Sequence, residues 1–176
     1  MRRETFAPFP FLLQRFVELV GVLEALDVAA RARVTVPVPG AAEVGGLLED
    51  PEVGDAAHRT IEVAAHLIAR EYDKAGDLVA AFRTVVNRLH GAFTILVVHE
   101  DQPDVVLAAR RNAPLVIGLG DGENFLGSDV AAFVEHTKRA ISVGQDEIVI
   151  LRSNSVDVIG FDGSPVTSEE FVVDWD

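Results

Sequence analysis

Five histidines are the side chains of this chain best suited to metal binding or proton transfer. No two of them have the H-x-x-x-H or H-E-x-x-H spacing that turns two imidazoles toward one zinc ion. We therefore expect histidines at the surface or at helix ends, and no metal site. The five are His58, His66, His90, His99 and His136.

Ser128, Asp129 and His136 provide the residue types of a hydrolytic triad. A nucleophilic serine of that kind usually sits on a sharp G-x-S-x-G turn, and Ser128 has no such surroundings. A triad therefore remains only an alternative interpretation of these three residues.

The glycine-rich stretch from Gly118 to Gly122, G-L-G-D-G, could hold a phosphate group. No Gly-Lys-Ser/Thr follows it, and no G-x-G-x-x-G opens a helix, so tight-turn chemistry is the better explanation. Asp121 and Glu123 also lack the alternating acidic ligands of a calcium loop. We expect a solvated turn at this position.

The overall charge limits the classes of partner. The chain has 15 Lys and Arg against 28 Asp and Glu, a net charge of −13, which repels nucleic acid and anionic membranes. The apolar segment 9–26 is interrupted by Arg15, Glu18 and Glu24, so we expect an amphipathic helix and no membrane span. The chain has no cysteine, which fits a reducing compartment, and we expect the cytoplasm.

The character of the sequence changes near residue 58. We expect residues 1–57 to form a divergent segment of helix and loops that breaks at Pro37, Pro39 and Gly40, and residues 58–176 to form a regular domain.

Within residues 58–176, apolar residues first follow a helical period. Ile61 to Ile68 and Leu78 to Leu89 predict two helices, with Gly76 as the stop of the first and Asp77 as the cap of the second. Exposed charge pairs are expected among Glu62, Arg70, Glu71 and Lys74.

After Gly91 the period changes to short apolar runs separated by turns. The runs predict a first hairpin around the turn 100–104, a second pair of strands around the turn 120–122, and one or two helical turns at 130–136. Two helices followed by antiparallel strands indicate an α+β layered domain. The expected strands are 92–98, 105–109, 115–119, 124–127, 141–143, 147–151 and 156–161.

Several segments resemble one known family in the same order and at similar spacing. The resemblance covers roughly residues 62–176, and its core is the stretch from Ala108 to Asp129, A-A-R-R-N-A-P-L-V-I-G-L-G-D-G-E-N-F-L-G-S-D. The segment L-H-G-A-F at 89–93 also matches. Together they resemble the glutaminase (class II glutamine amidotransferase) domain of glucosamine-6-phosphate synthase, which is glutamine–fructose-6-phosphate aminotransferase (isomerizing).

This resemblance implies an N-terminal-nucleophile hydrolase fold, an α/β/β/α sandwich, of which we expect an incomplete copy. The parent reaction transfers the amide nitrogen of glutamine to fructose 6-phosphate and gives glucosamine 6-phosphate. In the family a terminal cysteine attacks glutamine, its own α-amine is the base, and asparagine and backbone groups stabilise the oxyanion.

The family's functional residues have no counterparts in this chain. It begins Met1-Arg2-Arg3, and Thr5 would become terminal only after cleavage behind Glu4. The family's arginine-tryptophan and H-N-G-I motifs are absent, since the only tryptophan is Trp175. The aspartate of its T-D-T-E motif, which binds the substrate amino group, falls on Thr60, and a neutral hydroxyl cannot replace that charge-assisted contact.

We therefore expect a truncated glutaminase-domain fragment, inactive on its own, with no catalytic, substrate-binding or metal-ligating residue and no cofactor. Glutamine is the ligand of the parent family and is not expected to bind to this chain; self-association or a complementing polypeptide is the expected kind of partner. The alternative is a non-catalytic binding or regulatory module on the same scaffold. One hypothesis for residues 1–57 is a shifted reading frame or an alternative start, which the encoding DNA would test.

Overall fold

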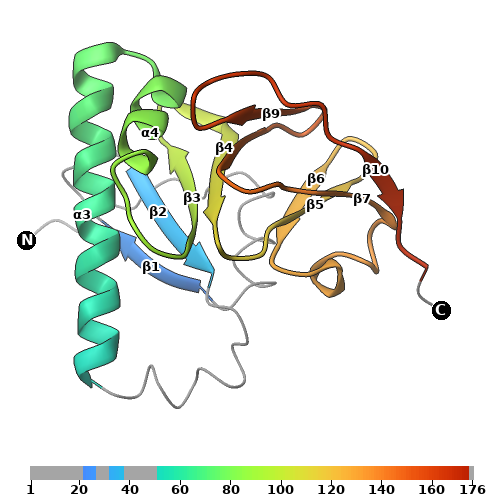
Figure 1. The fold of residues 1–176 in the computed structure, drawn as a ribbon, viewed down its shortest axis with the longest axis horizontal. Helices are drawn as coiled ribbons and strands as arrows, with labels where there is room; N and C mark the ends of the chain where they lie inside the picture. Colours follow the sequence, from blue (N-terminus) through green and yellow to red (C-terminus); the bar gives the residue numbers. More distant parts are fainter. Residues whose placement is uncertain (1–21, 27–31, 38–50, 175–176) are drawn as a thin grey trace, which may run out of the picture.

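The structure is a computed structural model that describes residues 22–26, 32–37 and 51–174, with side chains from residue 63 onward. Its elements form a layer of helices, a six-stranded sheet and a four-stranded sheet (Figure 1).

The helical layer consists of α3 (Pro51–Ala75) and α4 (Leu78–Val86). Gly76 ends α3 with φ +65°, a left-handed conformation that costs glycine little. The carboxylate of Asp77 accepts the backbone N–H groups two and three residues later, at 2.9 and 3.1 Å, and so caps α4. Both predicted helices, the glycine stop and the aspartate cap are confirmed.

Both sheets are antiparallel, and each strand is hydrogen-bonded to the strands beside it in spatial order. That order in the first sheet is β1 (Val22–Leu26), β2 (Ala32–Pro37), β3 (Phe93–His99), β4 (Gln102–Arg111), β8 (Glu147–Leu151) and β9 (Val156–Gly160). In the second sheet it is β10 (Glu170–Val172), β7 (Arg139–Ser142), β5 (Val116–Leu119) and β6 (Asn124–Gly127).

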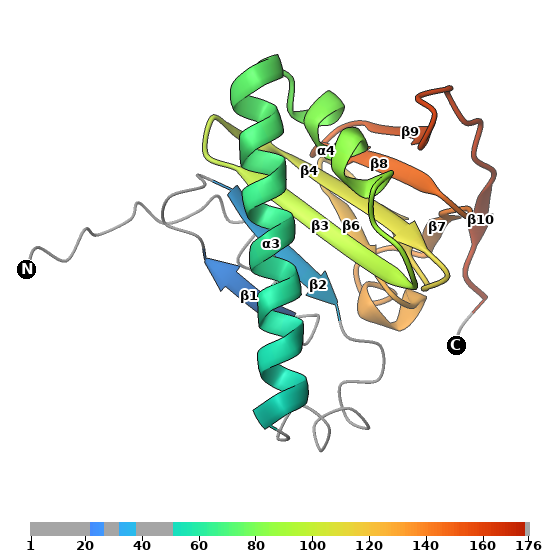
Figure 2. The same cartoon turned by 60° about the vertical axis from the view of Figure 1, so that its left-hand side comes forward.

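The first sheet is covered on both faces. The helices pack on one face, where α3 crosses the strands in Figure 2, and the second sheet packs on the other. Strand β4 shows this by alternation, because Leu107 and Ala109 belong to the helix-side core while Val106 and Ala108 belong to the core between the sheets. A strand buried on both faces reads as a continuous apolar run, which explains the sequence V-V-L-A-A at 105–109.

The predicted fold class is confirmed as α+β. The described residues form the helical layer and both sheets of an α/β/β/α sandwich, which agrees with the expected incomplete copy of that architecture. Over the outer face of the second sheet lies the single 3-10 turn η1 (Val130–Ala132), followed by Phe133.

The expected helix over residues 9–26 is wrong where the structure describes it. Residues 22–26 form β1, which pairs with β2, and residues 9–21 lie outside the described residues. Leucine, glutamate and alanine are good helix formers, but helix propensity amounts to less than about 1 kcal/mol per residue, and backbone pairing with a neighbouring strand overrides it. Strand β2 was not expected either, although Val34, Thr35 and Val36 are β-branched residues typical of a strand.

Two smaller differences concern connections. The change of sequence character at residue 58 falls within α3, so one continuous helix crosses it. The turn between β3 and β4 contains only residues 100 and 101, because His99 already pairs with Gln102.

The short strand β10 was not expected from the sequence. In the described part of the chain, neither helix is long and apolar enough to cross a membrane.

Gly118 generates a first prediction, because β5 passes directly beneath the buried ring of Phe133. A Cβ at this position would lie 2.6 Å from the nearest ring atom. We expect Gly118→Ala to lower the free energy of unfolding by about 1–3 kcal/mol through overpacking, as measured by urea denaturation. In a Phe133→Leu background the same substitution should cost less. An equal cost in both backgrounds would show that the close approach to the ring is not the cause.

Candidate functional site

The stretch from Ala108 to Asp129 runs from the middle of β4 through β5 and β6 and ends at the cap of η1, so it connects the two sheets. Its polar groups support this connection. Asn124 is only 8% exposed, and its Nδ2 donates to the carbonyl oxygen of Arg152 at 2.8 Å, which ties β6 to the turn after β8. The hydroxyl of Thr94 donates to the carbonyl oxygen of Pro114 at 3.2 Å.

The predicted turn at Gly120 to Gly122 is confirmed. The N–H of Gly120 donates to the carbonyl oxygen of Glu123 at 2.9 Å, and Gly122 has φ +73°. Asp121 is exposed on this turn. These features close the β5–β6 hairpin and need no bound ion.

A cluster of contacts around one arginine lies where β4 ends, and we call it the Arg111 junction: Arg111, Asp146, Leu89, Phe93 and Phe161. The Nε of Arg111 donates to Oδ1 of Asp146 at 2.7 Å, and its Nη1 donates to the carbonyl oxygen of Leu89 at 2.7 Å. Its guanidinium also lies over the rings of Phe93 and Phe161, 5.7 and 5.0 Å from their centroids. One side chain thus joins the end of the helical layer to the first sheet.

Backbone strain is concentrated beside this junction. Among the described residues, Asn112 and Asp146 are the non-glycine residues with positive φ, at 53° and 56°. Gln145 connects them. Its Oε1 accepts the Asn112 N–H at 3.1 Å, and its Nε2 donates to Oδ1 of Asn112 at 3.1 Å and to Oδ1 of Asp146 at 3.3 Å. Strained residues often mark functional sites, but they persist wherever their surroundings over-determine them. At this junction the polar side chains bond to other groups of the domain, so the geometry supports a structural role for the strained residues.

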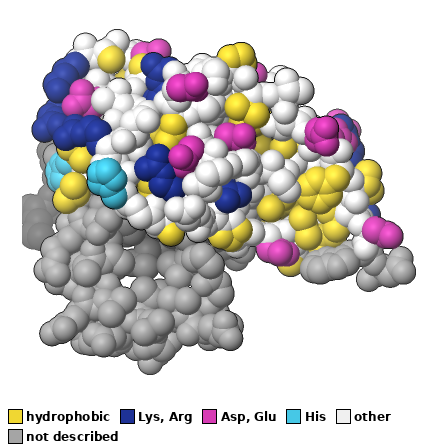
Figure 3. Space-filling view, viewed as in Figure 1, with side chains coloured by type: hydrophobic (Ala, Val, Ile, Leu, Met, Phe, Trp, Pro, Cys, Tyr) yellow, Lys and Arg dark blue, Asp and Glu magenta, His cyan; other side chains and the backbone are white. Residues whose placement is uncertain are grey.

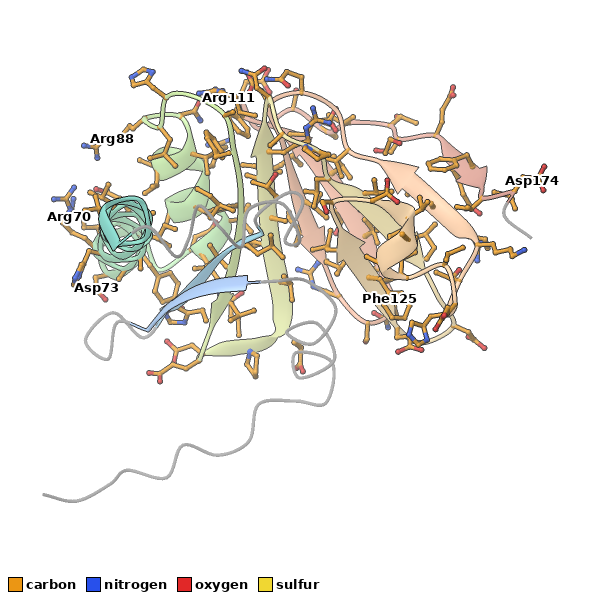
Figure 4. The ribbon with its side chains drawn as sticks, turned by 90° about the horizontal axis from the view of Figure 1, so that it is seen from below. Arg70, Asp73, Arg88, Arg111, Phe125 and Asp174 are labelled. Atoms are coloured by element: carbon orange, nitrogen blue, oxygen red, sulfur yellow. The ribbon has the colours of Figure 1, made fainter. Side chains whose placement is uncertain are left out.

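The triad interpretation gains no support from the surroundings of its residues. Oδ1 of Asp129 accepts the Ala131 N–H at 2.9 Å and caps η1. The ring of His136 stacks on Phe125 at 5.3 Å, with 9° between the planes. These contacts engage Asp129 and His136 separately. Figure 4 also places Phe125 well away from Arg111, so the two polar regions do not form one site.

Among the residues that the structure describes, no group of three or more potential ligands could hold a metal ion. His99 differs from the expected surface position, because it is only 2% exposed. It lies at the end of β3 with its ring 4.4 Å from that of Tyr72, and its Nδ1 accepts the Asp101 N–H at 3.2 Å. Packing under α3 and a backbone partner explain its burial.

The predicted charge pairs on α3 are confirmed for the residues whose side chains are described. Lys74 donates to both oxygens of Glu71, at 3.1 and 3.2 Å, and Arg70 lies 3.4 Å from the same carboxylate. The hydrogen bond from Lys74 lowers the pKa of Glu71. The side chain of Glu62 lies outside the described part. These are surface pairs of small energetic weight.

Thr60 occupies the position that the resemblance assigns to the substrate-binding aspartate. Its side chain is outside the described part, but its backbone lies inside α3, which begins at Pro51. Residues 59–62, which the resemblance aligns with the T-D-T-E motif, therefore lie within this helix. Backbone groups in a helix interior bond to residues four positions away and are not available to a ligand.

The Arg111 junction generates a second prediction. We expect Arg111→Lys to lower the free energy of unfolding by about 1–3 kcal/mol, because lysine cannot reproduce the planar contacts with a carboxylate, a carbonyl and two rings. Asp146→Asn retains a residue tolerant of positive φ and removes the charge, so the double variant should lose less than the sum of the single variants. Chemical denaturation of the four proteins measures this coupling.

The matched control for that cycle is Arg152→Lys. Arg152 pairs with Asp157 at 3.3 Å, and their side chains are 41% and 64% exposed. Its cost should stay within about 0.5 kcal/mol. Strict additivity of Arg111→Lys and Asp146→Asn would contradict the junction as a unit.

Comparisons with known proteins show which proteins this chain is similar to. No family model matches the chain. Curated relatives named glutamine–fructose-6-phosphate aminotransferase [isomerizing] do: that of Leifsonia xyli subsp. xyli is 64% identical over 115 residues, 65% of this chain and 19% of the relative. The Streptomyces coelicolor protein is 57% identical over 115 residues, with the same two coverages. That of Mycolicibacterium paratuberculosis is 46% identical over 136 residues, 73% of this chain and 22% of the relative.

Two solved structures are also similar, at 19% identity and over 80% of this chain. One is the glutamine phosphoribosylpyrophosphate amidotransferase from B. subtilis with ADP and GMP, with a TM-score of 0.46 and 31% of its chain covered. The other, described as the allosteric regulatory enzyme of purine biosynthesis, has a TM-score of 0.47 and 30% of its chain covered.

The chain spans about a fifth of the length of the three curated relatives, those of Leifsonia xyli, Streptomyces coelicolor and Mycolicibacterium paratuberculosis. Over 65–73% of its length the chain is similar in sequence to glutamine–fructose-6-phosphate aminotransferases, as the stretch from Ala108 to Asp129 predicts.

Proposed function

We propose that this chain supplies a glutaminase-type framework that does not hydrolyse glutamine by itself. The observation that carries this proposal is the absence of cysteine from all 176 residues. The reaction implied by the resemblance begins with attack of a cysteine thiol on the glutamine amide, and this chain has no thiol to form the covalent intermediate.

The surroundings of the remaining polar groups support the same conclusion. Arg110, Arg111 and Asn124 all donate to carbonyl or carboxylate oxygens inside the domain, and Asp129 caps a turn. A general base must be within hydrogen-bond reach of the proton that it removes. These four side chains instead hold strands and turns of the domain together.

The activity in the names of the relatives, transfer from glutamine to fructose 6-phosphate, belongs to much longer proteins. We propose that this chain lacks that activity when alone and that it needs a complementing polypeptide for any role in such a reaction. Hydrolysis of glutamine by this chain can therefore be measured separately from transfer of its nitrogen to the sugar phosphate.

The test of this proposal is ammonia release from glutamine by the purified chain. Loss of a catalytic nucleophile lowers kcat by a factor on the order of 10⁴–10⁶, so no ammonia should exceed the protein-free background even at high protein concentration. A full-length relative is the positive control. Ammonia release that scales with concentration and co-elutes with the chain on size-exclusion chromatography would disprove the proposal.

A non-catalytic binding or regulatory module is the second candidate, and the packing of the core favours it. Two continuous apolar clusters occupy the two interfaces of the first sheet, and their central side chains, including Phe82, Leu107 and Ile148, are fully buried. A domain packed in this way is expected to unfold cooperatively, which a binding module requires.

Thermal unfolding tests the module hypothesis separately from catalysis. We expect one cooperative transition, little binding of an apolar dye before it, and no change in Tm with glutamine in large excess, because a ligand of the native state would raise Tm. A broad transition with strong dye binding at low temperature would instead indicate a fragment that does not pack. A rise in Tm that saturates with glutamine would show that the glutamine site survives.

A further inference from the structure

Strand β10 is an exposed edge with apolar side chains. It is the last strand of the second sheet, and its three residues are all exposed. Phe171 and Val172 are 40% and 69% exposed, and with Val63 on α3 they are the exposed large hydrophobic residues of the described part. Figure 3 shows hydrophobic side chains gathered at the end of the molecule where Figure 1 places β7 and β10.

The backbone of β10 is oriented to accept another strand. The N–H of Val173 donates to the carbonyl oxygen of Lys138 at 2.7 Å, toward β7. Because successive residues of a strand point their N–H and C=O groups to opposite sides, the backbone groups of Phe171 also face β7, while Glu170 and Val172 direct theirs away from the sheet. In the part of the chain that the structure describes, no residue accepts or donates a backbone hydrogen bond on that outer side.

The charge at this edge is locally compensated in a strongly acidic protein. Arg139 on β7 donates to both oxygens of Glu170, at 2.6 and 3.0 Å. This contact lowers the pKa of Glu170, so the carboxylate is ionised and paired at neutral pH. The net charge of −13 opposes self-association in general, but Arg139 offsets part of the charge of the carboxylate nearest to the open edge.

Only one antiparallel register of β10 against itself satisfies both the backbone and the charges. With a two-fold axis at Phe171, Glu170 of each copy lies opposite Val172 of the other, and all the outward N–H and C=O groups can bond. A two-fold axis at Glu170 would place that carboxylate opposite itself. An axis at Val172 would place Glu170 opposite Asp174.

We propose that β10 is an interface between two copies of this chain, which pair edge to edge about a two-fold axis at Phe171. The four-stranded sheets of the two copies then form one continuous sheet across the dimer. Phe171 meets its own copy in the closely spaced, non-hydrogen-bonded position, where aromatic pairs contribute most. The contact is small, so the dimer is concentration-dependent.

Sedimentation velocity of the full chain over a wide concentration range tests this interface. The wild-type chain should shift from one copy to two as concentration rises. Phe171→Glu and Phe171→Lys should each raise the dissociation constant on the order of tenfold or more, because each puts like charges opposite one another. An equimolar mixture of these two variants should restore the dimer at low salt, because opposite charges then meet across the axis.

Two further variants separate the interface from folding. Val172→Pro removes an outward N–H and leaves the β7 ladder intact, so it should weaken the dimer without changing the far-UV circular dichroism spectrum. Val63→Lys changes the other exposed apolar residue and should leave the dimer unchanged. A wild-type chain that stays monomeric at every concentration would overturn the proposal. So would a dimer that persists in both Phe171 variants, or a mixture of the two that does not associate.

Discussion

Strand β4 is buried on both faces, and the other layers are arranged around it. Leu107 and Ala109 contact the helix-side core, Val106 and Ala108 contact the core between the sheets, and all four are less than 9% exposed. A strand in this position cannot carry a charged side chain in its middle without a large desolvation cost. Charged and polar groups therefore gather at its ends, and the Arg111 junction lies at one of them. The position of this polar cluster is thus a consequence of the buried apolar middle of β4.

Local signals predicted those elements whose causes lie close together in the sequence. Gly76 and Asp77 end one helix and cap the next within two residues, and both functions follow from side-chain type alone. The β5–β6 hairpin likewise contains its own turn glycines. By contrast, β10 depends on β7, which lies about thirty residues earlier, and the hairpin of β1 and β2 joins the first sheet only through β3. The short sequences of β1 and β10 have no periodicity that separates a strand from a helix turn or a linker.

The same distinction explains which parts of the candidate site could be predicted. The turn at Gly120 to Gly122 and the pairing of Glu71 with Lys74 were expected from spacing alone. The Arg111 junction was not, because it brings together residues from four separated segments, and nothing near Arg111 in the sequence marks Asp146 or Phe161 as its partners. The burial of His99 was missed for a related reason, since its neighbour Tyr72 is on α3. Contacts between layers are set by packing, which periodicity does not reveal.

The edge strand β9 of the first sheet is partly covered, whereas the edge strand β10 of the second sheet is open, and this difference bears on the proposed association. The outer side of β9 is partly covered by the chain that follows it: Pro165 bridges Ile159, and the N–H of Val166 donates to the carbonyl oxygen of Val158 at 2.9 Å. Proline and a returning segment are common means of preventing a sheet edge from pairing. Strand β10 has no proline, and its exposed side chains include Val172. The chain therefore protects the edge of the sheet that carries its main core and leaves the shorter edge available for association.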